Sequence, residues 1–160
     1  MPVGRFIGGI AAVLWRPDQD RYLILRRAAT KDFGAGHWET VTGRVDQGEG
    51  YIEAVHREVR EEIGVEVTIE FIIGVTHFYR GDTPSAENEL IGAVFCCTTT
   101  DPDAIRLSLE HDAQRWVTAA EAVAEFPERW LGHVIARADL MNRMLPDELR
   151  SVMQAEGYAF

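Results

Sequence analysis

The segment from Gly50 to Ile63 constrains the fold most strongly, because its apolar residues repeat at the spacing of a helical turn. They recur three and four residues apart and form one stripe along a helix, made of Ile52, Val55, Val59 and Ile63. Gly64 follows at once, where a left-handed helix cap is common. The rest of the chain must supply an apolar layer that covers this stripe.

Runs rich in β-branched and aromatic residues predict that the covering layer is a β-sheet. We expect strands at Ile7–Trp15, Arg21–Arg27, Trp38–Val45, Val65–Tyr79, Glu89–Thr99 and Asp112–Thr118. Polar segments with glycine or proline predict loops at residues 30–37 and 80–88. Strands on both sides of a helix predict an α/β or α+β sandwich around one mixed sheet.

The last third of the chain predicts helices. Thr118 and Glu121 form a capping-box pattern at the start of one of them. A second is expected at Glu128–Arg143, with one face made of Trp130, Val134, Ala138 and Met141. Pro146 predicts one more turn before a loose tail. At 160 residues the whole chain, 1–160, is expected to form a single domain.

Composition limits the classes of partner. The formal net charge of −10 repels polyanions and argues against a nucleic-acid polymer, although a divalent cation can reverse the field inside one pocket. No apolar run is long enough for a membrane span and no signal-peptide layout is present, so we expect no membrane partner and a cytoplasmic location. Cys96 and Cys97 are adjacent in a strand and are expected to be reduced, buried thiols.

The predicted helix also carries a ridge of carboxylates. Glu58, Glu61 and Glu62 are three and four residues apart and lie on one side. Mg²⁺ prefers oxygen ligands and takes them from carboxylates, water and substrate phosphates. Gly43 and Gly48 would let the preceding loop turn tightly beside the ridge. The alternative is a solvated helix face, where such glutamates are common.

The spacing around this ridge resembles the Nudix box, G-x5-E-x7-R-E-U-x-E-E-x-G-U, in which U is aliphatic. Every specified position matches, at Gly43, Glu49, Arg57, Glu58, Val59, Glu61, Glu62, Gly64 and Val65. The resemblance implies a Nudix-type α/β/α sandwich. It also implies a hydrolase that uses Mg²⁺, with Mn²⁺ as an alternative, to cleave a nucleoside diphosphate linked to another group.

The resemblance also implies roles for single residues. Glu58 and Glu62 would be the principal metal ligands, assisted by Glu61 and by the backbone carbonyl of Thr42. Glu49 and Arg57 would form a supporting ion pair beside Gly43. This chain has Val41-Thr42-Gly43 where the family has Pro-Gly-Gly.

Other candidate residues rest on their chemistry. A carboxylate must accept the proton of the attacking water, and Glu61, Glu62 and Glu110 are the catalytic candidates. Arg27 and Arg44 can grip phosphate oxygens, and Trp38 and Phe78 can stack on a base. The alternatives are surface charges for the arginines and core packing for the aromatic residues.

The substrate is less constrained than the reaction. The Val-Thr-Gly entry and the segment from Glu110 to Trp116 resemble the dihydroneopterin-triphosphate/dATP pyrophosphohydrolase branch. That resemblance implies a (d)NTP or dihydroneopterin-triphosphate-like substrate. ADP-ribose or a dinucleotide is the alternative substrate, and a non-catalytic nucleotide-binding module is the alternative class. A homodimer is a further possibility.

Overall fold

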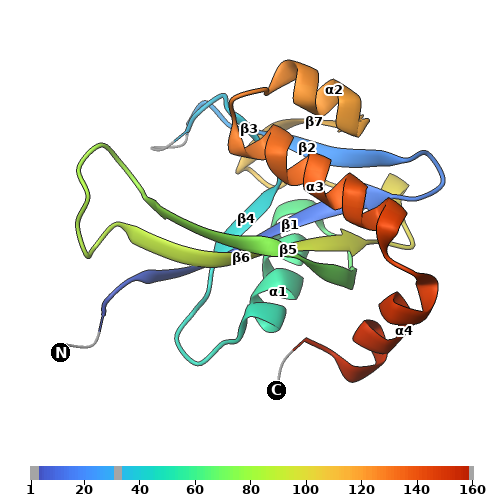
Figure 1. Ribbon diagram of the computed structural model, residues 1–160. Coiled ribbons are helices and arrows are strands. Elements are labelled where there is room, and N and C mark those ends of the chain that lie inside the picture. The colour runs from blue at the N-terminus through green and yellow to red at the C-terminus, as the bar shows by residue number, and fades with distance from the viewer. Residues whose placement is uncertain (1–3, 31–33, 159–160) are drawn as a thin grey trace.

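The computed structural model describes residues 4–30 and 34–158, in which strands alternate with helices (Figure 1). The elements in chain order are β1 (Ile7–Arg16), β2 (Arg21–Arg27), β3 (Trp38–Glu39), β4 (Val41–Arg44), α1 (Tyr51–Ile63), β5 (Thr68–Tyr79), β6 (Glu89–Thr98), a 3-10 turn (Pro102–Ala104), β7 (His111–Val117), α2 (Ala119–Glu125), α3 (Trp130–Met144) and α4 (Asp147–Glu156). Each expected strand forms with small shifts at its ends, and the one expected at Trp38–Val45 is split into β3 and β4. The loop expected at 30–37 lies partly outside the described residues.

Strand β1 joins segments that are far apart in the sequence. It pairs in parallel with β6, from Ile7 opposite Leu90 onward, and antiparallel with β4, where Ile10 lies opposite Gly43. Beside the hairpin turn β1 also pairs with β2, which then separates from it to pair with β3 and β7. The resulting seven-stranded sheet is mixed, as predicted. The separation of β2 from β1 brings β4 beside the middle of β1.

Two apolar clusters cover opposite faces of this sheet. The first contains Val55, Val59 and Ile63 of α1, and the second contains Leu131 and Ile135 of α3 together with part of α2. The fold is therefore a three-layer α/β/α sandwich, which confirms the predicted class.

The alternation along β6 assigns its cysteines to different layers. Cys97 belongs to the cluster under α1 and Cys96 to the cluster under α3, because neighbouring side chains in a strand point to opposite faces. Both are buried free thiols, as expected.

Helix α1 forms as its apolar stripe predicts. Val55, Val59 and Ile63 are buried, and Ile52 packs against them. Gly64 ends the helix with φ 73°, and its N–H donates to the carbonyl of Arg60. The stripe fixes the rotation of the helix about its axis. It therefore also fixes which glutamates face the sheet and which face water.

The C-terminal helices differ from the expectation in two respects. Of the predicted apolar face of α3, Ala138 is buried and Val134 and Met141 pack against the cluster that contains Leu131 and Ile135. Trp130 is the exception, because it is 39% exposed and lies outside that cluster. The single turn and loose tail expected after Pro146 are wrong. The segment forms α4, which is anchored by Arg150 and Gln154 to the buried carboxylate of Glu70 at 3.2 and 2.9 Å. The capping box of α2 is confirmed.

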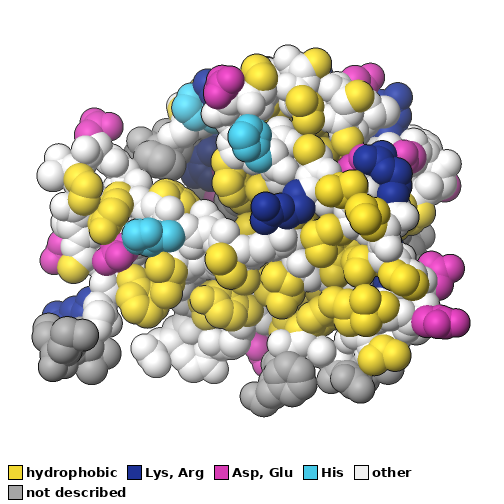
Figure 2. All heavy atoms as spheres, in the orientation of Figure 1, with side chains coloured by type: hydrophobic (Ala, Val, Ile, Leu, Met, Phe, Trp, Pro, Cys, Tyr) yellow, Lys and Arg dark blue, Asp and Glu magenta, His cyan; other side chains and the backbone are white. Residues whose placement is uncertain are grey.

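Apolar side chains gather on the face of the molecule that carries β5, β6 and the C-terminal helices (Figure 2). The large exposed hydrophobic residues of these elements include Val75 of β5, Met144 of α3 and Val152 of α4. The expected homodimer stays a prediction. In the described part of the chain, every helix is too short or too polar to cross a membrane.

Candidate active site

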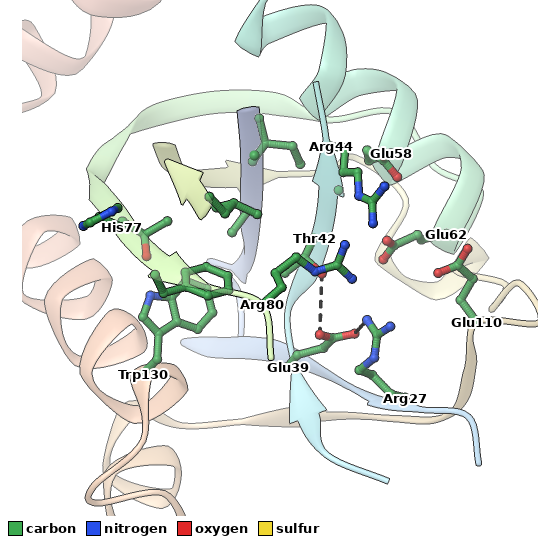
Figure 3. A pocket seen from close by; sticks show the side chains of 17 residues that line it. Arg27, Glu39, Thr42, Arg44, Glu58, Glu62, His77, Arg80, Glu110 and Trp130 are labelled. Carbon is green, nitrogen blue, oxygen red and sulfur yellow. Dashed lines mark hydrogen bonds and ion pairs between the residues drawn. The ribbon is translucent and has the colours of Figure 1, made fainter. Parts of the chain in front are cut away.

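A pocket of about 670 Å³ opens beside the middle of β1, between α1 on one side and β5 with α3 on the other (Figure 3). It is lined by Gly9, Ile10, Ala11, Arg27, Glu39, Thr42, Gly43, Arg44, Glu58, Glu62, Thr76, His77, Phe78, Arg80, Leu90, Glu110 and Trp130. This size suits a small organic ligand. Eight of the predicted site residues line it, namely Arg27, Thr42, Gly43, Arg44, Glu58, Glu62, Phe78 and Glu110.

One end of the pocket is acidic. Glu58 and Glu62 lie four residues apart on α1 and reach it from the same side of the helix. Glu110 arrives from the segment that leads into β7, and Figure 3 shows its carboxylate near those of Glu62 and Glu58. The fold thus adds a third carboxylate to the two that the helix supplies.

Glu62 is held in an environment that disfavours its negative charge. Burial is the largest cause and the carboxylates of Glu39, Glu58 and Glu110 add to it, which together raise the pKa of Glu62 to about 9. Its Oε2 atom is buried and finds no hydrogen-bond partner among the described residues. Such an oxygen is stabilised by a proton or by a cation.

Glu58 is also constrained by its surroundings. Burial raises the pKa of Glu58, although Arg57 donates a hydrogen bond to its carboxylate at 2.8 Å. A Cβ atom at Gly43 would lie 2.0 Å from the carboxyl carbon of Glu58. Glycine is therefore required at this position of β4, because any larger residue would displace the carboxylate.

Arg57 ties the loop before α1 to the helix. Its Nε and Nη2 atoms donate to the two carboxylate oxygens of Glu49, each at 2.8 Å, and Nη2 also donates to the carbonyl of Arg44. The ion pair expected between Glu49 and Arg57 is therefore present, in bidentate form. The Arg57 guanidinium lowers the pKa of Glu49 to about 2.

The donor set suits a hard divalent cation such as Mg²⁺. Glu58, Glu62 and Glu110 offer carboxylate oxygens, and Oε2 of Glu62 lacks a hydrogen-bond partner among the described residues, which a cation would replace. Within the described residues, no three His, Cys, Asp or Glu side chains already stand close enough to hold one metal ion. Mg²⁺ accepts such a sparse set, because it takes part of its shell from water and from substrate phosphates. The ligand role expected for the carbonyl of Thr42 stays a prediction.

Three arginines also line the pocket. Arg27 comes from β2, Arg44 from β4, and Arg80 from the loop after β5 (Figure 3). Burial, followed by the charges of Arg44 and Arg27, lowers the pKa of Arg80. Guanidinium groups crowded in this way favour an anion such as phosphate between them.

Glu39 contacts both an arginine of the pocket and a buried histidine behind it. Its Oε1 atom accepts a hydrogen bond from Arg27 at 2.9 Å and lies 3.0 Å from Nε2 of His111. The side chain of His111 is fully buried, and its Nδ1 atom lies 3.8 Å from Oε2 of Glu62. His111 is the first residue of β7, and this strand holds its ring close to both carboxylates.

Four predicted site residues do not line the pocket, namely Glu49, Arg57, Glu61 and Trp38. The carboxylate of Glu61 is 59% exposed and pairs with Arg57 at 3.3 Å, on the solvent side of α1. The ring of Trp38 packs on the apolar cluster under α3, with the guanidinium of Arg115 4.6 Å from its centre. Glu61 therefore points from α1 toward solvent, and Trp38 points from β3 toward the layer of α3.

Sequence reasoning missed four residues that the fold brings to the site, namely Glu39, His77, Arg80 and Trp130. They come from β3, from β5 and the loop after it, and from the start of α3. No local motif connects them. Only Glu39 could have been found from the sequence, as a partner for Arg27. Charged residues in neighbouring strands are rarely buried unless they are paired.

Comparisons with known proteins agree with this geometry. The family description "NUDIX domain" matches residues 6–138. The chain is 31% identical over 130 residues to the dihydroneopterin triphosphate diphosphatase of Escherichia coli strain K12, covering 72% of this chain and 80% of that one. It also superposes on the MutT protein from Methanosarcina mazei Go1 with a TM-score of 0.72 and 25% identity, covering 89% of this chain and 99% of that one.

A third similarity is partial. The chain is 32% identical over 130 residues to a Myxococcus xanthus protein named octanoyltransferase, covering 81% of this chain. The matched region spans 35% of the length of that relative.

Proposed function

The chain belongs to the Nudix family, and on that premise we propose that it cleaves a nucleoside-triphosphate-like compound to a monophosphate and pyrophosphate. Membership makes the chain a hydrolase of phosphoanhydrides, and enzymes of this family generally use divalent metal ions. The substrate class is our proposal, a (d)NTP or a dihydroneopterin-triphosphate-like compound. The name of the E. coli relative supports it.

One observation carries the proposal, which is that carboxylates and guanidiniums face each other in a single pocket. Glu58 and Glu62 stand at one end, with Arg44 beside them and Arg80 farther across the pocket (Figure 3). A chain of phosphates needs both, because a cation held by carboxylates and a guanidinium can bind different oxygens of the same substrate. A pocket that only bound a neutral ligand would gain nothing from so many charges.

In the proposed site Glu58 and Glu62 hold Mg²⁺ or Mn²⁺, and the carbonyl of Thr42 is a further ligand. A bound ion would neutralise phosphate oxygens and lower the pKa of the attacking water. Glu49 and Arg57 position Gly43 beside Glu58 through their bidentate ion pair.

Glu110 is the general base that the geometry favours. It lines the pocket, whereas Glu61 is ion-paired to Arg57 on the outer side of α1. A base must reach the proton of the water within about one hydrogen-bond length or through one further water. Glu62 is less suited to this role in the proposal, because it is already committed to the cation.

The proposal is tested by resolving products with phosphorus NMR. Purified protein with Mg²⁺ or Mn²⁺ is given dATP, dihydroneopterin triphosphate, ADP-ribose and a diadenosine polyphosphate. We expect pyrophosphate and a monophosphate from the triphosphates. Release of two monophosphates from ADP-ribose, with the triphosphates left intact, would instead support the alternative substrate class.

The same assay separates an enzyme from a non-catalytic binding module. In the family, modules that have lost activity usually lose glutamates of the box, and this chain retains all of them at Glu49, Glu58, Glu61 and Glu62. Retention favours hydrolysis. Saturable nucleotide binding with no turnover of any compound in the panel would contradict the proposal.

A further inference from the structure

Trp130 is unusually exposed for a tryptophan. It is the first residue of α3 and leaves 39% of its surface accessible. The helix is anchored by Leu131 and Ile135, and Trp130 belongs to neither of the two apolar clusters that the described residues form. Packing of the core therefore does not account for its position.

The exposed ring lies at one end of the active-site pocket. Trp130 lines this pocket together with His77 and Phe78 of β5, and Phe78 is itself 42% exposed. Figure 3 shows Trp130 and His77 on the side opposite Glu58, Glu62 and Glu110, with Arg80 between the two groups and Arg44 beside the carboxylates. The lining thus changes from carboxylates to guanidiniums to aromatic rings across the pocket.

A nucleoside triphosphate has its groups in a matching order, with a cation-binding phosphate chain at one end and a flat heterocycle at the other. Stacking of a heterocycle on an aromatic side chain is favourable and tolerates many kinds of ring. We propose that Trp130 binds the planar ring of the substrate, with Phe78 at the same end of the pocket. The inference rests on the proposed function for the placement of the phosphates, and it assigns the ring-binding end to a residue outside the box.

This assignment makes Trp130 a specificity residue. It should discriminate between substrates that carry a heterocycle and those that do not, and it should leave the binding of the phosphate chain unchanged. Trp130 also borders a neighbouring groove lined by Phe126 and Arg137. If the ring served that groove instead, its loss would not alter the binding of a ring-bearing ligand in the active site.

Binding of two probes distinguishes these cases without turnover. Calorimetry with Mg²⁺ compares α,β-methylene-dATP, which carries a base, with inorganic triphosphate, which does not. For Trp130→Ala we expect the Kd of α,β-methylene-dATP to rise on the order of tenfold to a hundredfold. The Kd of inorganic triphosphate should stay at the wild-type value. Trp130→Phe keeps an aromatic face and should restore most of the loss.

Tyr51 supplies a matched control. It is the first residue of α1, as Trp130 is of α3, it exposes 41% of its surface, and it does not line the pocket. Tyr51→Ala should leave both Kd values unchanged. Equal changes for the two probes in Trp130→Ala, or no change for either, would overturn the inference. A wild-type protein that binds α,β-methylene-dATP no more tightly than inorganic triphosphate would overturn it too.

Failure of the proposed reaction would look different. If the protein binds α,β-methylene-dATP through Trp130 but releases no pyrophosphate from dATP, the reaction is wrong and the ring-binding assignment stands. If pyrophosphate is released and Trp130→Ala has wild-type affinity for both probes, the reaction stands and the assignment falls.

Discussion

At the scale of single residues, the carboxylate of Glu62 is buried and its Oε2 atom has no hydrogen-bond partner among the described residues. A bound cation would stabilise the negative charge and would also be the partner of that oxygen. We expect Glu62→Gln to lower kcat/KM by about a hundredfold or more, since even changes behind a metal ligand cost about 10- to 100-fold. The rise in Tm that Mg²⁺ gives the wild type should shrink in the variant. Without metal the Tm of Glu62→Gln should be at least as high as that of the wild type, because a buried carboxylate is replaced by a neutral amide.

Steady-state kinetics and thermal melts with and without Mg²⁺ check this expectation. Glu53→Gln is the control, since Glu53 lies exposed on the same helix outside the pocket lining. A Mg²⁺-dependent rise in Tm of wild-type size in Glu62→Gln would remove Glu62 from the metal site.

Glu49 gives a prediction about pH. Its hydrogen bonds from Arg57 lower its pKa from 4.5 to about 2. The folded state therefore binds the proton less readily than the unfolded state does. The ion pair stabilises the fold fully above pH 4.5, and this contribution is lost as the pH falls toward 2. We expect the difference in Tm between the wild type and Glu49→Gln to narrow over this range. A difference that stays constant from pH 7 down to pH 3 would show that the ion pair contributes nothing.

Which site residues the sequence could predict depends on how each reaches the site. Glu58 and Glu62 share one helix, so their spacing alone places them together. Glu39 and Arg80 reach the pocket through strand pairing and through a loop, and no spacing rule connects them. Glu61 illustrates the limit on the same helix, because spacing placed it with Glu58 and the rotation set by the buried stripe turned it toward water.

At the scale of secondary-structure elements, the contact between β4 and α1 depends on Gly43. A Cβ atom there would overlap the carboxyl group of Glu58, so Gly43→Ala must push that side chain aside. We expect activity to fall at least about tenfold, with a stability loss of about 1–3 kcal/mol. Kinetics and urea denaturation measure the two effects. Gly8→Ala is the control, because its new methyl group would meet Val45, the residue after β4, rather than Glu58. Equal loss of activity in both variants would contradict a specific role for Gly43.

The elements themselves were largely predictable, because alternation and helical spacing are local signals. In the predicted apolar face of α3 only Trp130 was misplaced, because it is apolar and yet lines the pocket, so hydrophobicity assigned it to the core. The length of α4 was underestimated for a different reason. Its sequence is polar, and the contacts that order it are made with Glu70, a residue of β5 that is distant in the sequence.

At the scale of the whole molecule, long-range pairing decides the fold. The parallel register of β1 with β6 joins residues that lie more than eighty positions apart, and no local pattern specifies it. The family resemblance implied the α/β/α sandwich, but it did not specify this register. The same pairing brings Gly9 and Leu90 to one wall of the pocket, so the global fold and the site are specified together.

The attachment of α4 gives a prediction for the whole molecule, because it separates stability from activity. Arg150 donates to the buried carboxylate of Glu70 at 3.2 Å and to Asn142 at 3.3 Å, and its side chain is 14% exposed. Arg150→Ala leaves a buried charge without its cation, which typically costs about 3–5 kcal/mol. Gln154 and Thr98 still donate to Glu70, so we expect the lower end of that range in urea denaturation. Neither Arg150 nor Glu70 lines the pocket, so kcat/KM at 25 °C should stay within about twofold of the wild-type value.

Adding Glu70→Gln to Arg150→Ala should recover part of the lost stability, because the unpaired charge is then gone. A large loss of activity in the folded Arg150→Ala protein would show instead that α4 is coupled to the active site.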